Sequence, residues 1–229
     1  MKTVLITGAN RGLGLGLTRH YLDQGAYVIA TARDPSSSFD FEQLSRSYVD
    51  RFTMIPVDVA SPDSIIDAAR RIGDIQIDLV INNAGVCPDE AFGSWEASTF
   101  ATAFAVNATG PALISQAMAP LLKRGAKLVN ISSALGSCSL DLNPETGLDA
   151  YGASKTALNM ITRRLATKLA PRQVTVVAIS PGWVQTRMGG DDAELTVEES
   201  VSSVTAVIES IDLDHSGSFM SRKGETLPW

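Results

Sequence analysis

The sequence predicts an α/β fold in which residues 1–229 form a single domain, with a doubly wound parallel sheet covered by helices on both faces. Three observations indicate this fold class. Strand-like and helix-like segments alternate along the chain, the strand-like segments are continuously apolar, and a glycine-rich turn follows the first of them. Continuous apolar strands are typical of a parallel sheet buried on both sides, and a regular β-α-β order produces double winding.

The individual elements follow from apolar runs, helical spacing and turn residues. Residues 13–24 have helical spacing and stop at Gly25, and Ser61 followed by Pro62 is typical of a helix N-cap. Gly110 and Pro111 are expected to disturb the longest helical region, because proline removes a backbone donor. The strands are predicted at residues 4–7, 27–31, 52–57, 77–81, 127–131, 174–179 and 218–221, and the helices at residues 13–24, 65–72, 98–123 and 150–169.

The composition excludes several classes of partner. The net charge is -6 and the charges are scattered, whereas nucleic-acid binding and docking on anionic lipid need clustered Lys and Arg. No apolar run reaches the ~20 residues of a membrane span, and the short N-terminal run is interrupted too early to be a signal peptide. Cys87 and Cys138 are expected to be free thiols, and no metal-ligand spacing surrounds them. We therefore expect a cytoplasmic protein without a metal.

A glycine-rich turn lies between the first predicted strand and the first predicted helix. Glycines there let the backbone approach a pyrophosphate, and the helix offers its free N–H groups to the phosphates, as in Rossmann-type folds. The alternative is a tight βα turn that binds no ligand, but the position between strand and helix favours a dinucleotide site. The candidate cofactor-binding residues in this turn are Gly8, Asn10, Arg11, Gly12, Leu13 and Gly14.

The spacing of this turn, T-G-x-x-x-G-x-G, resembles that of the short-chain dehydrogenase/reductase family. The resemblance covers the whole chain and implies a nicotinamide cofactor. It further implies that an Asp contacts the adenine ring, that an N-A-G segment lines the adenosine half, and that a P-G-x-V-x-T segment lies beside the carboxamide. The matching positions are Asp58, Val59, Asn83, Ala84, Gly85, Pro181, Gly182, Val184 and Thr186.

The end of the second strand indicates NADP(H) rather than NAD(H). An NAD-specific site usually carries a carboxylate there, but this chain has the neutral Thr31, followed by Arg33. A guanidinium binds a 2′-phosphate through two parallel hydrogen bonds, and Arg11 is expected to reach the same group. Two alternatives stay open: Arg33 is an ordinary surface charge, or Asp34 binds the ribose in a shifted register.

Tyr151 and Lys155 form the candidate catalytic centre. Residues four apart share one helix face, and a nearby ammonium lowers the pKa of a phenol, which is otherwise ~10. Such a pair alone is common in amphipathic helices. Here it follows a strand that ends in Ser132 and Ser133, and Ser133 matches the catalytic serine of the family. The resemblance also assigns Asn107 to a water link between the lysine and solvent.

These residues imply an oxidoreductase that moves a hydride between NADP(H) and a carbonyl or alcohol substrate, with Tyr151 as general acid/base. Residues 135–137, 188–190 and 217–229 resemble the branch of C-factor-type proteins and sniffer-type carbonyl reductases. The alternative is therefore a signalling or regulatory dinucleotide-binding protein. A sugar-nucleotide epimerase fits the glycine spacing less well. The resemblance implies a homodimer or homotetramer, and a small lid after Thr186. Candidates for an apolar substrate pocket are Trp95, Leu135, Cys138, Leu140 and Trp183, which could equally be core or rim residues.

Overall fold

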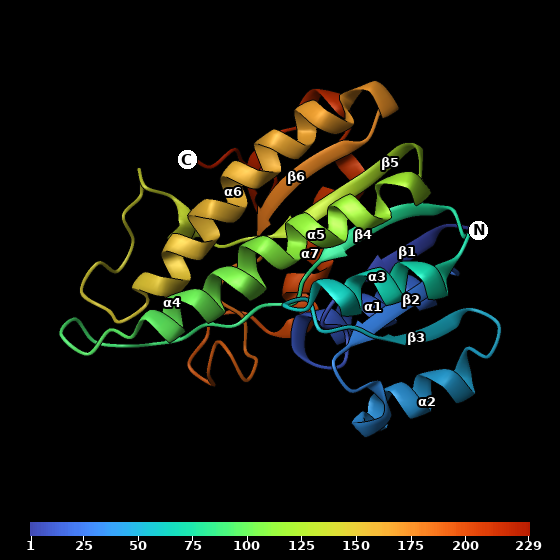
Figure 1. The fold of residues 1–229 in the computed structure, drawn as a ribbon, viewed down its shortest axis with the longest axis horizontal. Helices are drawn as coiled ribbons and strands as arrows, with labels where there is room; N and C mark the ends of the chain where they lie inside the picture. Colours follow the sequence, from blue (N-terminus) through green and yellow to red (C-terminus); the bar gives the residue numbers. More distant parts are fainter.

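The computed structural model describes residues 1–229, apart from the side chain of Ser37. Seven parallel strands form one sheet in the order β3-β2-β1-β4-β5-β6-β7 (Figure 1). This order reverses between β1 and β4, the position at which doubly wound folds bind ligands. The strands are β1 (Thr3–Ile6), β2 (Tyr27–Ala32), β3 (Phe52–Pro56), β4 (Ile77–Asn82), β5 (Leu122–Ile131), β6 (Thr175–Ser180) and β7 (Phe219–Ser221). The predicted fold class is confirmed.

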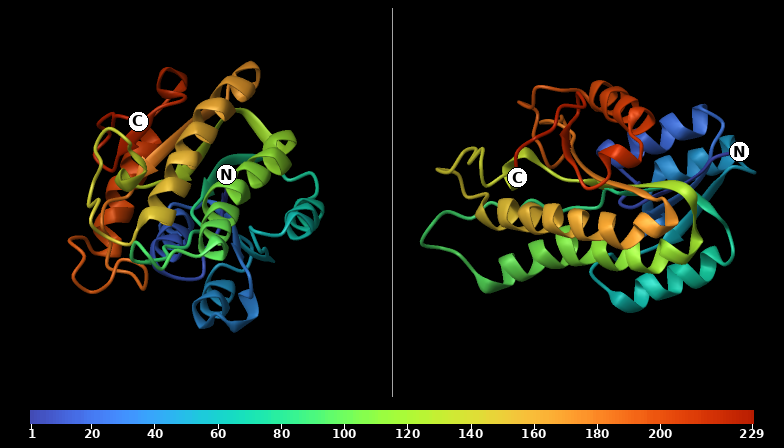
Figure 2. Two further views of the ribbon diagram at one scale, coloured as in Figure 1. Left: turned by 60° about the vertical axis from the view of Figure 1, so that its left-hand side comes forward. Right: turned by 90° about the horizontal axis from the view of Figure 1, so that it is seen from above.

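Helices cover both faces of the sheet, and the view from above in Figure 2 separates the two layers. Side chains of β1 alternate between two cores: Val4 and Ile6 pack on the side of α1, α2 and α7, and Leu5 packs on the side of α3, α5 and α6. This two-sided burial explains why the strands are apolar throughout. The helices are α1 (Gly12–Asp23), α2 (Phe39–Ser47), α3 (Pro62–Ile72), α4 (Ala97–Phe104), α5 (Gly110–Met118), α6 (Asp149–Leu169) and α7 (Val197–Ser210).

The longest predicted helix, residues 98–123, differs most from the structure. It consists of α4, a π-helical turn at Ala105–Thr109 and α5, and β5 already begins at Leu122. Pro111 does not interrupt a helix, because it lies in the first turn of α5, where its missing backbone N–H removes no helical hydrogen bond. The irregularity falls instead in the turn before it, where Gly110 lets the backbone approach Val59: a Cβ there would lie 2.7 Å from the Val59 carbonyl oxygen.

Two helices, α2 and α7, were not predicted from the sequence. Helix α7 begins with a capping box in which Thr196 accepts a hydrogen bond from the Glu199 backbone and the Glu199 carboxylate accepts one from the Thr196 backbone. Its apolar side chains complete the core beside α1. None of the helices in the described part of the chain is both long and apolar enough to cross a membrane.

Candidate active site

The glycine turn after β1 is fixed to the end of β4. The Thr7 hydroxyl accepts hydrogen bonds from the backbone N–H groups of Asn83 (3.0 Å) and Ala84 (3.1 Å). In return, the Asn83 amide donates to the carbonyl oxygens of Thr7 and Gly8. The predicted phosphate-binding turn and the predicted N-A-G segment are therefore one rigid unit, and Thr7 is a positioning residue that the sequence reasoning did not single out.

Two glycines of this turn have no room for a side chain. Gly8 has φ +64°, and a Cβ there would lie 2.8 Å from the Ala84 Cα. A Cβ on Gly14 would lie 2.3 Å from the Gly8 carbonyl oxygen and 2.5 Å from the Asn83 amide nitrogen. The turn therefore keeps its path only with glycine at both positions. The resulting surface of bare backbone beside the α1 N-terminus fits a pyrophosphate.

Arg11 and Arg33 are both exposed beside this turn, and neither guanidinium forms a hydrogen bond or ion pair with a described residue. Arg11 is the N-cap residue of α1 and does not cap the helix through its side chain. The Asp34 carboxylate accepts hydrogen bonds from the Ser36 backbone and hydroxyl and so caps a short 3-10 turn. Capping of this turn explains the position of the Asp34 carboxylate without a contact to a ribose.

The predicted adenine and carboxamide contacts also lie along this edge. The Asp58 carboxylate accepts a hydrogen bond from the Ala60 backbone, and Val59 is buried against Gly110. Gly12 and Thr186 are adjacent: a Cβ on Gly12 would lie 3.2 Å from the Thr186 methyl group. The structure thus brings together residues that follow β1, β3, β4 and β6.

The segment after β6, where the sequence predicts a small lid, is fixed by its own contacts. Leu195 pairs with Val184 in an isolated bridge, and the Trp183 indole donates to the Gly189 carbonyl oxygen at 2.7 Å. Pro181 is held by the Ser200 hydroxyl at the start of α7. Gly182, with φ +84°, lets the chain turn beneath Leu195. These contacts hold Val184 and the neighbouring Thr186 in place after β6.

Ser133 and Tyr151 meet at the end of β5. The Ser133 hydroxyl caps a 3-10 turn by accepting from the Leu135 backbone, and it lies near enough to the Tyr151 hydroxyl to lower the pKa of that phenol. Ser132 faces the other way: it is buried and donates to the Asn159 side chain at 2.7 Å. The structure therefore places Ser133, and not Ser132, beside the phenol.

Lys155 lies one helical turn after Tyr151 and is 4% exposed. Its Nζ lies 5.6 Å from the centroid of the Tyr151 ring and donates to the Ile131 carbonyl oxygen at 2.8 Å. Burial lowers the pKa of Lys155 to about 8. Burial also raises the pKa of Tyr151, and the neighbouring Ser133 hydroxyl opposes that shift only in part.

The pKa of Tyr151 corrects the sequence-based argument. We expected the nearby ammonium to lower this pKa, but in the ligand-free protein the desolvation of the phenolate outweighs other effects. Tyr151 is therefore fully protonated at neutral pH. A protonated phenol is the form required of a proton donor to a carbonyl oxygen.

Asn107 lies in the π-helical turn, and both its side-chain oxygen and its amide nitrogen form hydrogen bonds with protein groups. Its oxygen accepts from the Val86 backbone (2.9 Å), and its amide donates to the Val86 carbonyl oxygen (2.8 Å) and to the Ser154 hydroxyl (2.9 Å). Ser154 in turn donates to the Tyr151 carbonyl oxygen. Asn107 therefore connects the segment after β4 to α6, the helix that carries Tyr151. The contact of Asn107 with a water molecule stays a prediction.

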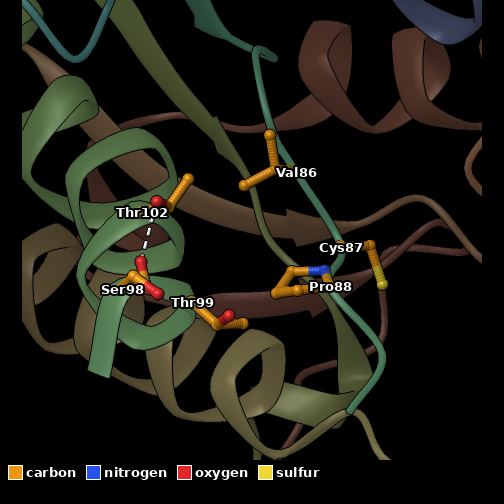
Figure 3. Close-up of a pocket in the computed structure, with 6 residues that line it drawn as sticks. All are labelled: Val86, Cys87, Pro88, Ser98, Thr99 and Thr102. Atoms are coloured by element: carbon orange, nitrogen blue, oxygen red, sulfur yellow. Dashed lines mark hydrogen bonds between the residues drawn. The ribbon is translucent and has the colours of Figure 1, made fainter. Parts of the chain in front are cut away.

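A groove of about 390 Å³ lies between α4 and the segment after β4, lined by Val86, Cys87, Pro88, Ser98, Thr99 and Thr102. Figure 3 shows Val86 and Pro88 facing the α4 residues, whereas the Cys87 sulfur is turned to the opposite side of the segment. Cys87 and Cys138 are both free thiols, as expected. Because its sulfur turns away from α4, Cys87 lies on the side of the segment that is near Tyr151 and Lys155.

Residues 225–229 fix the loop that follows Ser133. The segment pairs with β7, and its Pro228 carbonyl oxygen accepts from the Ser137 hydroxyl at 2.7 Å. The Trp229 carbonyl oxygen accepts from the Ser139 backbone, and the Trp229 ring stacks on Phe219. The path of the loop beside the catalytic residues therefore depends on a segment distant in sequence.

Replacement of Lys155 with Met should flatten the pH dependence of stability. The unfolded lysine holds its proton up to about pH 10.5 and the buried one only to about pH 8, so the unfolded chain binds more protons between these values. The free energy of unfolding of the ligand-free protein should therefore rise with pH across this window, by about 3 kcal/mol in total. Urea unfolding at a series of pH values measures this slope.

The slope should be much smaller in Lys155→Met and should persist in Lys168→Met, which removes an exposed lysine from the same helix. An equal slope in Lys155→Met and the wild-type protein would contradict the burial of a titrating ammonium at this position.

Comparisons with known proteins agree with this geometry. The short chain dehydrogenase family model matches residues 2–195. The C-signal protein of Myxococcus xanthus is 40% identical over 159 residues, which are 67% of this chain and 93% of that protein. The NADPH-bound carbonyl reductase from chicken fatty liver is 33% identical with a TM-score of 0.92, covering 100% of this chain and 99% of that one. The carbonyl reductase Sniffer of D. melanogaster is 29% identical with a TM-score of 0.92, covering 100% of both chains.

The family model covers most of the chain, and the structural similarity extends over all of it. The glycine turn, the serine after β5 and the tyrosine and lysine of α6 meet at one edge of the sheet, as the sequence resemblance implies. This chain therefore belongs to the short-chain dehydrogenase family.

Proposed function

We propose that this protein is an NADP(H)-dependent carbonyl reductase in which Tyr151 is the general acid. The observation that carries the proposal is the position of Tyr151, whose hydroxyl lies near Ser133 and whose ring centroid lies 5.6 Å from the Lys155 ammonium. The phenol is protonated at neutral pH, as a proton donor must be. The NADPH- and NADP-bound carbonyl reductases among the structural relatives support the same reaction class.

The residues present fit a nicotinamide dinucleotide. The glycine turn has bare backbone where a Cβ would collide, which suits close approach of a pyrophosphate. Arg11 and Arg33 have unengaged guanidinium groups on the same side, suited to a 2′-phosphate. Thr186 would contact the carboxamide beside Gly12. When bound, the cofactor supplies the hydride.

The protein's own residues would handle the proton and the developing charge. The Tyr151 hydroxyl donates its proton to the carbonyl oxygen of the substrate. The Ser133 hydroxyl donates a hydrogen bond to the same oxygen and stabilises its negative charge. The Lys155 ammonium stabilises the phenolate that remains on Tyr151 until it is reprotonated. Asn107 connects Val86, after β4, to α6, which carries Tyr151 and Lys155. In alcohol oxidation, the same groups act in reverse.

The similarity to C-signal favours one second candidate, a signalling protein that binds a dinucleotide without turnover. This chain has Ser133 and Lys155 beside Tyr151, and Asn107 bonded to the helix that carries them, which a purely binding role does not require. NADPH consumption with a panel of aldehydes, ketones and quinones, with NADH as control, tests the enzyme proposal. We expect turnover with NADPH, and its absence across the panel would favour the signalling role. The homodimer or homotetramer implied by the resemblance is part of this proposal.

Removal of the two arginines should shift cofactor preference. In Arg11→Ala/Arg33→Ala, the affinity for NADPH should fall by about 10- to 100-fold, because each charge-assisted contact with a phosphate contributes roughly 1.5–3 kcal/mol but the two are exposed. The affinity for NADH, which lacks the 2′-phosphate, should change little. Isothermal titration with both cofactors measures the two constants.

Arg71→Ala removes an exposed arginine from α3 and is the matched control. Equal losses of NADPH and NADH affinity in the double variant would show that these arginines do not recognise the 2′-phosphate.

A further inference from the structure

A second hollow, of about 470 Å³, lies between the loop that follows β4 and the loop that precedes α6. In Figure 1 the green segment before α4 and the yellow segment before α6 both extend beyond the carboxyl ends of the strands. The Glu90 backbone donates to the Gly147 carbonyl oxygen at 2.9 Å and joins the two loops. A Cβ on Gly147 would lie 2.3 Å from a carboxylate oxygen of Asp89, so the loops are packed closely at this point.

The two segments that line this hollow also carry Tyr151 and Cys87. Asp149, on one wall, lies two residues before Tyr151 in the first turn of α6. Asp89, on the other wall, lies two residues after Cys87, whose thiol is near enough to influence the pKa of Tyr151. Both walls therefore belong to segments that also carry Tyr151 or a residue near it.

Two exposed aromatic side chains line the hollow. Phe92 is 87% exposed and Trp95 is 44% exposed, and their rings meet edge to face with centroids 5.2 Å apart. Trp95 also contacts Phe100 of α4 at 5.6 Å, which fixes its orientation. Large apolar side chains that remain exposed together in a concave site are typical of ligand contacts. They offer a face to a planar or aromatic group.

The charge of the hollow is negative and uncompensated. Asp89, Glu145 and Asp149 line it, and their carboxylates form no hydrogen bond or ion pair with any described residue. None of the residues that line the hollow is Lys, Arg or His. By contrast, the neighbouring Glu90 carboxylate is occupied by the Thr99 hydroxyl and the Glu96 backbone.

We propose that this hollow is an outer substrate subsite that holds an aromatic or planar group and selects cationic and neutral carbonyl substrates over anionic ones. The inference rests on the proposed function, since it assigns the substrate class of the same site. Carboxylates attract a cation and repel an anion, and an aromatic face adds a cation–π attraction. Because these carboxylates are exposed, salt weakens their effect.

Three para-substituted benzaldehydes that carry a trimethylammonium group, no substituent or a carboxylate test the selection by charge. At low ionic strength, kcat/KM with NADPH should be about tenfold or more higher for the cationic aldehyde than for the anionic one, and the ratio should shrink with added salt. In Asp89→Asn/Glu145→Gln/Asp149→Asn the ratio should fall to within about threefold. Asp50→Asn, which removes an exposed carboxylate before β3 at the opposite edge of the sheet, should leave the ratio unchanged.

Binding of benzyltrimethylammonium, measured by calorimetry, separates this inference from the proposed function. Its affinity should exceed that of benzoate and should fall in Trp95→Ala and in the triple variant, whether or not the protein turns over aldehydes. Absence of turnover of unsubstituted benzaldehyde and every other neutral carbonyl compound would count against the proposed function alone. A charge ratio unchanged in the triple variant, or equal binding of the two benzyl ligands, would overturn the subsite.

Discussion

Tyr151→Phe should lower kcat/KM for carbonyl reduction by about 10²–10⁴-fold while NADPH still binds. The substitution removes only the hydroxyl that meets Ser133 at the end of β5, and phenylalanine keeps the ring that packs beside Lys155. The hydride donor and the pocket remain, but no side-chain proton reaches the carbonyl oxygen. Steady-state NADPH oxidation measures the rate, and fluorescence titration of NADPH measures the binding.

Tyr48→Phe is the matched control, since it removes a hydroxyl that bonds to Asp23 on the far side of the sheet. Its catalytic constants should equal those of the wild-type protein. If Tyr151→Phe reduces carbonyl compounds within about threefold of the wild-type rate, Tyr151 is not the general acid.

Gly14→Ala should abolish most cofactor binding. The added methyl group would lie 2.3 Å from the Gly8 carbonyl oxygen and 2.5 Å from the Asn83 amide, and both atoms belong to the turn that is fixed by Thr7. Relief of such overpacking costs about 1–3 kcal/mol. Because the turn itself must move, the affinity for NADPH should fall by about 10- to 100-fold, as measured by isothermal titration.

Gly16→Ala separates this effect from a general loss of stability. A Cβ on Gly16, in the same helix, would press on the Val197 and Val201 side chains of α7 and would not contact the turn. The variant should therefore lose stability and keep its affinity for NADPH. Equal losses of affinity in the two variants would show that the glycine turn does not carry the cofactor site.

The strands were predictable from the sequence because burial on both faces leaves a local pattern, a continuous apolar run. Helix α7 was missed although its signals were present: Thr196 and Glu199 have capping-box spacing, and Val197, Val201 and Val204 recur at helical intervals. Helix α2 carries only two buried side chains, Phe41 and Leu44, so its apolar pattern is weak.

Motifs identified the candidate site residues, but they did not predict the pKa values or the contacts of these residues. The pKa of Tyr151 depends on how tightly distant segments enclose the phenol, which no local pattern encodes. Likewise, the contacts of Asn107 with Val86 and Ser154 require the π-helical turn, whose position depends on the close approach of Gly110 and Val59.

Transfer of deuterium tests the central claim most directly. The wild-type protein is incubated with a neutral aromatic aldehyde and NADPH that carries deuterium at both C4 positions, and the alcohol product is examined by mass spectrometry. Hydride transfer from the cofactor predicts one deuterium on the former carbonyl carbon, formed about 10²–10⁴-fold more slowly in Tyr151→Phe. Formation of unlabelled alcohol, or of no alcohol with any neutral carbonyl compound while NADPH binds, would contradict it.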